Sequence, residues 1–117
     1  MTPRVRTMKE LRRRDGKRAE LEGMYHRVDL RMAPEGPAAD DELASAVLLS
    51  DRTVVLIEPS WSEASVRPAD EVERFDGEDV VVTGTAHERS PQPEQEAAAI
   101  VSPCVSGVES IRLASEG

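Results

Sequence analysis

The sequence predicts an all-β, or mainly β, domain within its 117 residues. Valine, leucine and isoleucine gather in short runs, and segments rich in proline, glycine and aspartate separate these runs, as is typical of short strands joined by loops. Only two short segments carry the signals of a helix. Because the apolar residues are clustered rather than scattered, one small folded domain fits better than a disordered chain.

The composition excludes several classes of protein. No apolar run approaches the roughly 20 residues that a membrane-spanning helix needs, so we expect no membrane contact. Cys104 is the only cysteine, which excludes a disulfide scaffold. The amino terminus has no apolar signal-peptide core, and we therefore expect the protein in the cytoplasm.

The first predicted element is a short N-terminal helix. Thr7 and Glu10 have the spacing of a capping box, in which each side chain satisfies a free backbone amide of the other residue. The helix would cover residues 8–14 and end at Asp15-Gly16, since glycine favours the end of a helix.

A long strand is expected over residues 17–32. Ala19 and Leu21 share one strand phase, whereas Val28 lies in the opposite phase. A strand changes phase when one residue is inserted, and Gly23 stands at the change. We therefore predict a β-bulge centred on Gly23.

A loop and a hairpin are predicted for the middle of the chain. Residues 33–43 are rich in proline, glycine and aspartate, which favours a loop. Two apolar runs follow, at 44–50 and 53–58, and the dipeptide Asp51-Arg52 that joins them completes the pattern of a hairpin.

A second short helix should begin after the irregular residues 59–67. Pro68 favours the first turn of a helix, and Val72 and Phe75 follow at helical spacing. Gly77 would end this helix.

The last third of the chain is expected to form two strands. Residues 79–86 are a run of strand-forming residues, and the polar residues 87–97 indicate a loop. The final strand is expected within residues 98–113, where Pro103 requires an edge or a bulge.

Part of the sequence recurs at an offset of 61 positions. In each copy a short helix ends at Asp-Gly, and a strand follows with a glycine seven positions later. Two explanations stay open: a distant internal duplication, or two units that obey the same local rules for ending a helix and starting a strand. The recurring residues are Glu10, Arg13, Asp15, Gly16, Gly23 and His26, which return as Glu71, Arg74, Asp76, Gly77, Gly84 and His87.

The order of these elements carries a resemblance to a known fold. Asp15-Gly16 followed by Leu21–Tyr25 would form the first strand, Asp76-Gly77 followed by Val80–Gly84 the fourth, and Pro68–Phe75 the helix before it. The order resembles the OB-fold, which is a five-stranded Greek-key barrel. In the OB-like barrel expected here, a short helix lies between strands three and four.

The resemblance implies a division of the chain. It covers residues 16–113, which would form the OB-like barrel domain. Residues 1–15 would form a basic N-terminal arm that contains the short N-terminal helix, and residues 114–117 a tail.

The charge is distributed unevenly along the chain. The formal net charge is −8, yet residues 1–18 carry +6, so the remaining residues carry −14. The OB-fold resemblance implies that ligands meet the face of strands two and three and the loops after strands one and four. Here these loops are residues 33–43 and 87–97, which carry −4 and −2. Phosphate backbones need a positive groove, so nucleic acid is disfavoured at the site that the fold implies.

The leading interpretation is therefore a non-catalytic module that binds another protein. An acidic body suits the covering of a basic partner, as in a bacterial immunity or accessory protein, and electrostatic steering would speed the association. Aromatic side chains on a surface favour such contacts, although Trp61 could instead cap the end of the barrel. The candidate contact residues are Trp61, Tyr25, Asp40, Asp41, Glu42, Glu88 and Glu94.

The alternative is a single-stranded nucleic-acid-binding OB-fold protein that uses its basic arm. Arg12, Arg13, Arg14 and Arg18 would contact the phosphates. The same arm could bind an acidic protein, or only neutralise the acidic body of the chain.

We expect no enzymatic activity, no metal and no cofactor. The chain has no glycine-rich phosphate loop, nucleophile elbow or paired-histidine zinc motif. His26 and His87 are expected at opposite ends of neighbouring antiparallel strands, which is too far apart for one ion. Cys104 lacks a visible base and is interpreted as a buried structural thiol. Open sheet edges would allow a homo-oligomer.

Overall fold

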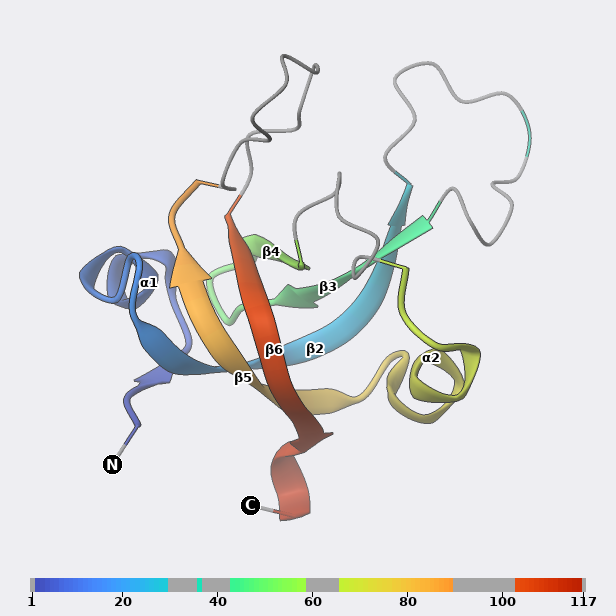
Figure 1. The fold of residues 1–117 in the computed structure, drawn as a ribbon. Helices are drawn as coiled ribbons and strands as arrows, with labels where there is room; N and C mark the ends of the chain where they lie inside the picture. Colours follow the sequence, from blue (N-terminus) through green and yellow to red (C-terminus); the bar gives the residue numbers. More distant parts are fainter. Residues whose placement is uncertain (1, 30–35, 37–42, 59–65, 90–102, 117) are drawn as a thin grey trace.

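The computed structural model describes residues 2–29, 36, 43–58, 66–89 and 103–116, and within them the chain is mainly β, as predicted (Figure 1). The predicted loop at 59–67 therefore lies mostly outside the described residues, as do most of the loops at 33–43 and 87–97. The elements are β1 (Arg4–Val5), α1 (Met8–Arg13), β2 (Arg18–Asp29), β3 (Leu43–Leu48), β4 (Val54–Ile57), α2 (Ala69–Phe75), β5 (Asp79–His87), β6 (Cys104–Leu113) and the 3-10 helix η3 (Ala114–Glu116).

The strands form one six-stranded mixed sheet in the order β1-β2-β3-β4-β6-β5, and β2 also pairs with β5. The β1–β2 and β4–β6 pairs are parallel, whereas the other neighbours are antiparallel. Seven residue pairs join β2 to β5, but only two join β4 to β6. The described strands therefore do not form the closed five-stranded barrel that the sequence predicts. The two-residue strand β1 was not predicted at all.

The predicted bulge at Gly23 is wrong. The pairing of β2 with β5 runs without interruption from Arg18 to Met24, where β2 exchanges this partner for β3. The apparent change of phase has another cause, because both faces of the sheet are apolar at this end. Tyr25 continues into the main core, whereas Val28 packs in a second cluster on the opposite face. The register shift lies instead between β5 and β6, beside Gly84.

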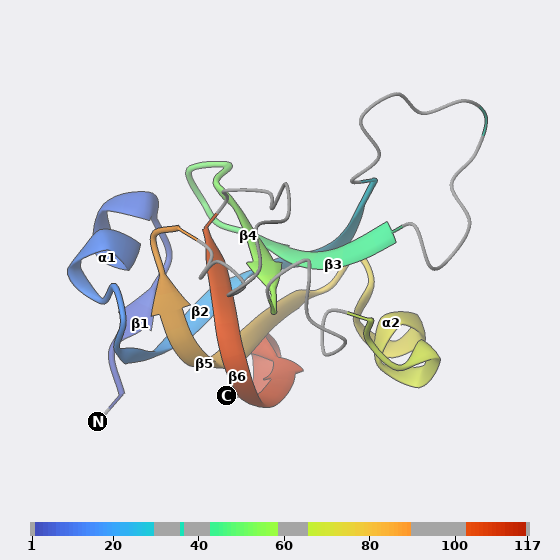
Figure 2. The same cartoon turned by 45° about the horizontal axis from the view of Figure 1, so that its top comes forward.

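Both helices lie where the sequence predicts them. The Thr7 hydroxyl accepts the backbone amide of Glu10 at 3.3 Å, which confirms the predicted cap of α1. Helix α2 ends at Phe75 and is followed by Asp76-Gly77. The two helices lie at opposite ends of the sheet (Figure 2).

Two apolar clusters hold the sheet together. The main core is enclosed by the curved sheet and contains fully buried residues of all six strands and of α1, together with Phe75 from α2. The second cluster consists of Ala44, Ala46, Leu56 and Cys104. Cys104 is therefore buried, as the sequence predicts.

The sequence recurrence corresponds to a local two-fold relation between α1–β2 and α2–β5. The amide of Gly16 donates to the carbonyl of Ala86, and the amide of Gly77 donates to the carbonyl of Tyr25, both at 2.7 Å. Both glycines have a positive φ, of 77° and 84°. The centre of the relation is the pair Leu21↔Val82 in the β2–β5 ladder. Duplication and shared local rules would both produce this geometry.

The N-terminal segment packs against the sheet. Val5 in β1 and Leu11 in α1 are fully buried and belong to the main core. The backbone carbonyl of Arg6 accepts the amide of Ser50, which ties the segment to the turn between β3 and β4. A domain boundary at residue 15 stays a prediction.

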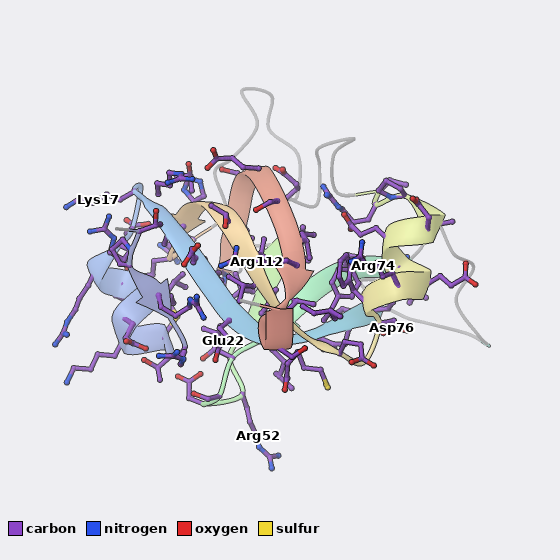
Figure 3. All side chains as sticks on the ribbon, turned by 90° about the horizontal axis from the view of Figure 1, so that it is seen from below. Lys17, Glu22, Arg52, Arg74, Asp76 and Arg112 are labelled. Atoms are coloured by element: carbon purple, nitrogen blue, oxygen red, sulfur yellow. The ribbon has the colours of Figure 1, made fainter. Side chains whose placement is uncertain are left out.

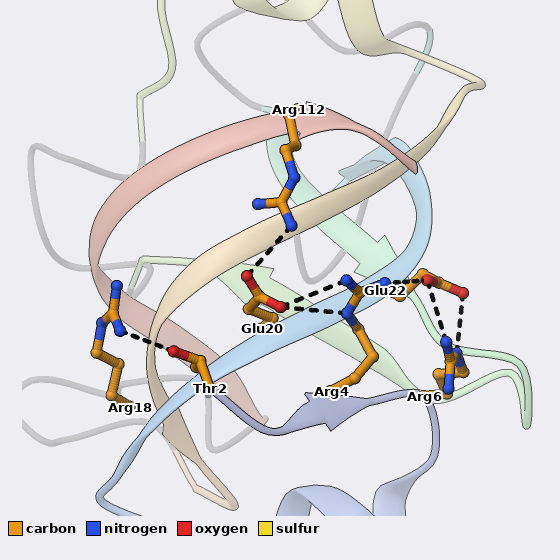
Figure 4. A network of polar contacts seen from close by, with 7 residues as sticks. All are labelled: Thr2, Arg4, Arg6, Arg18, Glu20, Glu22 and Arg112. Atoms are coloured by element: carbon orange, nitrogen blue, oxygen red, sulfur yellow. Dashed lines mark hydrogen bonds and ion pairs between the residues drawn. The ribbon is translucent and has the colours of Figure 1, made fainter. Parts of the chain in front are cut away.

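A network of ion pairs joins side chains of β1, β2 and β6, with Arg112 of β6 reaching across β5 (Figure 4). Glu20 binds Arg4 and Arg112, and Glu22 binds Arg4 and Arg6. The hydrogen bond from Arg6 holds the pKa of Glu22 below its ordinary value, although partial burial opposes the shift. Several positive charges of the N-terminal segment are thus neutralised within the chain itself.

Candidate functional site

Most of the predicted contact residues lie outside the described part of the chain. These are Trp61, Asp40, Asp41, Glu42 and Glu94. Their role in binding stays a prediction.

The other two predicted contact residues are described, and neither is a free surface group. Tyr25 is fully buried, so its expected place on the exterior is wrong: it belongs to the strand phase that faces the main core. The Glu88 carboxylate accepts a hydrogen bond from Arg12 Nε at 3.0 Å.

The basic residues of the predicted arm are mostly engaged with other parts of the chain. Arg12 binds Glu88 and Arg18 binds Glu109, both through ion pairs. Arg14 donates to the backbone carbonyl of Arg18 at 3.1 Å. Arg13 is exposed. These four side chains therefore do not form a continuous positive groove.

A buried polar network joins α2 to the sheet. The Tyr25 hydroxyl donates to the Glu71 carboxylate at 2.9 Å, and it lies 2.7 Å from the Ser45 hydroxyl. Arg67 donates to both carboxylate oxygens of Glu71, each at 2.8 Å. The Arg67 and Glu71 side chains are each only 15% exposed. The bond between Tyr25 and Glu71 helps to fix the position of α2, because the buried Tyr25 hydroxyl loses its carboxylate acceptor if α2 moves.

We expect the Tyr25 phenol to stay protonated at pH values well above the ordinary pKa of tyrosine. Burial raises its pKa, the nearby Ser45 hydroxyl partly opposes this, and the hydrogen bond to Glu71 adds to the increase. The folded chain thus holds the proton more tightly than the unfolded chain, so this contribution to stability is present below about pH 10 and is lost as the pH rises further. Tyr25 is the only tyrosine, so its phenolate absorbance can be followed directly. A phenolate signal near pH 10 from a still folded protein would contradict the expectation.

A groove separates α2 from β6. It has a volume of about 270 Å³ and is lined by Arg67, Asp70, Glu71, Arg74, Phe75 and residues 108–111. Its apolar surface comes from Phe75, Val108 and Ile111. Arg74 lies over the Phe75 ring at 4.9 Å. The groove is open and mixed in character, which suits a side chain of a protein better than a fully enclosed small molecule.

The surface around α2 is strongly acidic. Residues 68–79 contain six acidic residues and one arginine, a net charge of −5. Figure 3 shows Arg74 on α2 and Asp76 directly after the end of this helix. The sequence contains this signal, but the OB-fold resemblance points to the loops at 33–43 and 87–97 and not to this segment. The exposed acidic residues are Asp70, Glu73, Asp76, Glu78 and Asp79.

Other kinds of site find no support in the described residues. They contain no group of three histidine, cysteine, aspartate or glutamate side chains that could hold a metal ion. No helix described here is long and apolar enough to cross a membrane. In comparisons with known proteins, no family model matches the chain, and no curated protein or solved structure is significantly similar to it.

Proposed function

We propose that this protein is a non-catalytic module that binds a basic protein partner through the surface around α2. The observation that carries the proposal is the net charge of −5 on residues 68–79, a segment that contributes Asp70, Glu71, Arg74 and Phe75 to an open groove with an apolar floor. Acidic residues around an apolar centre give an interface both attraction at long range and contact energy at short range. A bacterial immunity or accessory protein that covers a basic partner in the cytoplasm would use such a surface.

We also propose an OB-like topology for the module. The support is the order of strand pairings, in which β2 meets both β3 and β5, together with the parallel β4–β6 pair. Helix α2 lies between β4 and β5 in the chain, which correspond to strands three and four of an OB-fold.

A capture experiment with three forms of the chain tests the binding proposal. In the first variant, Asp70→Asn, Glu73→Gln and Asp76→Asn remove three charges from the α2 surface. In the matched control, Asp40→Asn, Asp41→Asn and Glu42→Gln remove three charges from the loop that the sequence singled out.

The native chain should retain a protein in stoichiometric amount from a lysate of its source cells at low salt. The α2 variant should retain about one tenth as much as the native chain, and the loop variant should retain more than the α2 variant, because the proposal places the main contact at α2. Capture of no protein would contradict the proposal, as would undiminished capture by the α2 variant.

Binding of single-stranded nucleic acid by the basic arm has less support. Among the described arginines of this segment, Arg4, Arg6, Arg12 and Arg18 bind glutamates of the same chain. A phosphate contact at these positions would have to replace an existing ion pair. A mobility shift with random single-stranded DNA or RNA at about 10 µM protein would favour this alternative if it required residues 1–14.

A further inference from the structure

The local two-fold relation allows the surroundings of α1 and α2 to be compared position by position. Val5 and Val66 are 61 positions apart, as are Arg6 and Arg67, so both pairs extend the recurrence. Val5 is fully buried in β1, beside β2. Its counterpart Val66 is 68% exposed, and within the described residues it is the large apolar side chain most open to solvent.

The space beside the two helices differs as well. Glu10 and Arg13 help to line a groove of about 130 Å³ between α1 and β1. Their counterparts Glu71 and Arg74 help to line the larger groove, of about 270 Å³, between α2 and β6. The groove beside α2 is thus larger than the groove beside α1. In addition, Val66, which directly precedes the groove residue Arg67, is an apolar residue that the chain does not bury.

Among the described strands, none pairs with the part of the β6 edge that faces this groove. Strand β4 pairs with β6 only at Cys104 and Val105. Beyond this point the Glu58 carboxylate accepts the amides of Gly107 and Val108, at 3.1 and 2.9 Å. From Glu109 to Leu113, β6 has β5 on one side and no described strand on the other. An unpaired edge offers backbone donors and acceptors to an added strand.

We infer that an extended, basic segment of a partner protein adds as a strand to the edge of β6 at residues 109–113 and places one apolar side chain in the groove. In this mode of recognition the backbone hydrogen bonds supply affinity, and the pocket for a side chain supplies specificity. Phe75 and Ile111 would contact the apolar side chain, and the acidic residues around α2 would attract the basic ones. The inference rests on the proposed function, because it assigns the basic partner a conformation and a place.

The test uses the full-length chain and the heptapeptide acetyl-KVKVKVK-amide, which is basic and alternates in the manner of a strand. A second peptide, acetyl-KVKPKVK-amide, has a proline at its centre that removes one backbone donor and opposes strand pairing. Amide resonances of the protein are followed by NMR during each titration. The first peptide should shift the amides of residues 109–113 and of α2, and the proline peptide should bind about tenfold more weakly.

Val66→Lys provides a variant that should weaken binding without disturbing the core, because this side chain is exposed. Ser115→Lys adds the same charge at an exposed position outside the residues that line the groove. Val66→Lys should lower the affinity for the first peptide by about tenfold, while Ser115→Lys should leave it within about twofold of the native value.

Three results of the titrations would overturn the inference: no shifts at about 1 mM peptide, shifts confined to other elements, or equal binding of the proline peptide. A peptide-free chain that is dimeric by light scattering, with protected amides at 109–113, would also overturn it, because a second copy would then occupy the edge. If the peptides fail while capture still depends on the α2 acids, strand addition is wrong and the proposed function stands. Failure of the capture experiment contradicts the proposed function itself.

Discussion

Replacing Gly23 with alanine should lower the free energy of unfolding by about 3 kcal/mol, the largest effect that we expect from any single methyl group in this chain. A β-carbon at this position would overlap the backbone carbonyl of Leu48 and would lie 2.8 Å from Cγ1 of Val47. A clash with backbone cannot be relieved by a change of rotamer, so β2 and β3 must separate where β2 exchanges one partner strand for the other. The midpoint of urea unfolding measures the loss.

Gly77→Ala provides the matched control. Gly77 has a positive φ of 84°, but a β-carbon there would meet no atom within 4 Å. Its cost is therefore the strain of a left-handed residue alone, about 1 kcal/mol. A Gly23→Ala protein that is as stable as Gly77→Ala would show that β2 and β3 do not approach as closely as described.

The sequence predicted the elements that depend on local chemistry. The cap of α1 depends only on Thr7 and Glu10, which are three residues apart. Strand β5 is an apolar run that can be recognised without knowledge of its partner strands. Strand β1 could not be predicted from the sequence, because two residues show no periodicity and Val5 is placed by its pairing with Leu21 of β2. Prediction from the sequence also failed at Gly23, where the requirement comes from the backbone of another strand.

The candidate site was harder to predict than the fold, because its parts are distant in the sequence. Tyr25, Ser45 and Glu71 meet only after three elements have packed together. The charge of the α2 segment could have been counted from the sequence alone. The groove between α2 and β6 could not be predicted from the sequence, because it depends on where the pairing between β4 and β6 ends.

Replacing Glu58 with alanine should lower the free energy of unfolding by about 3 kcal/mol, the second large effect. Glu58 is 8% exposed, and its two carboxylate oxygens accept the amides of Gly107 and Val108. These amides belong to the irregular part of β6 opposite Gly84, where the ladder to β5 is interrupted. Without the carboxylate the amides of Gly107 and Val108 both lose their acceptor, and hydrogen bonds to a charged group contribute more than neutral ones. Glu58→Gln keeps one acceptor oxygen, so its cost should be about half that of the alanine variant.

The backbone of Glu58 allows a sharper test, because this residue has a positive φ of 70°. Alanine keeps the strain of the left-handed conformation, whereas glycine removes it. Glu58→Gly should therefore be about 1 kcal/mol more stable than Glu58→Ala, the reverse of the usual order for these two residues in a strand. Urea unfolding of the native chain and the three variants measures both effects. Equal stability of the native and alanine forms would show that the carboxylate does not hold β6, and an alanine form more stable than the glycine form would show that the backbone is unstrained.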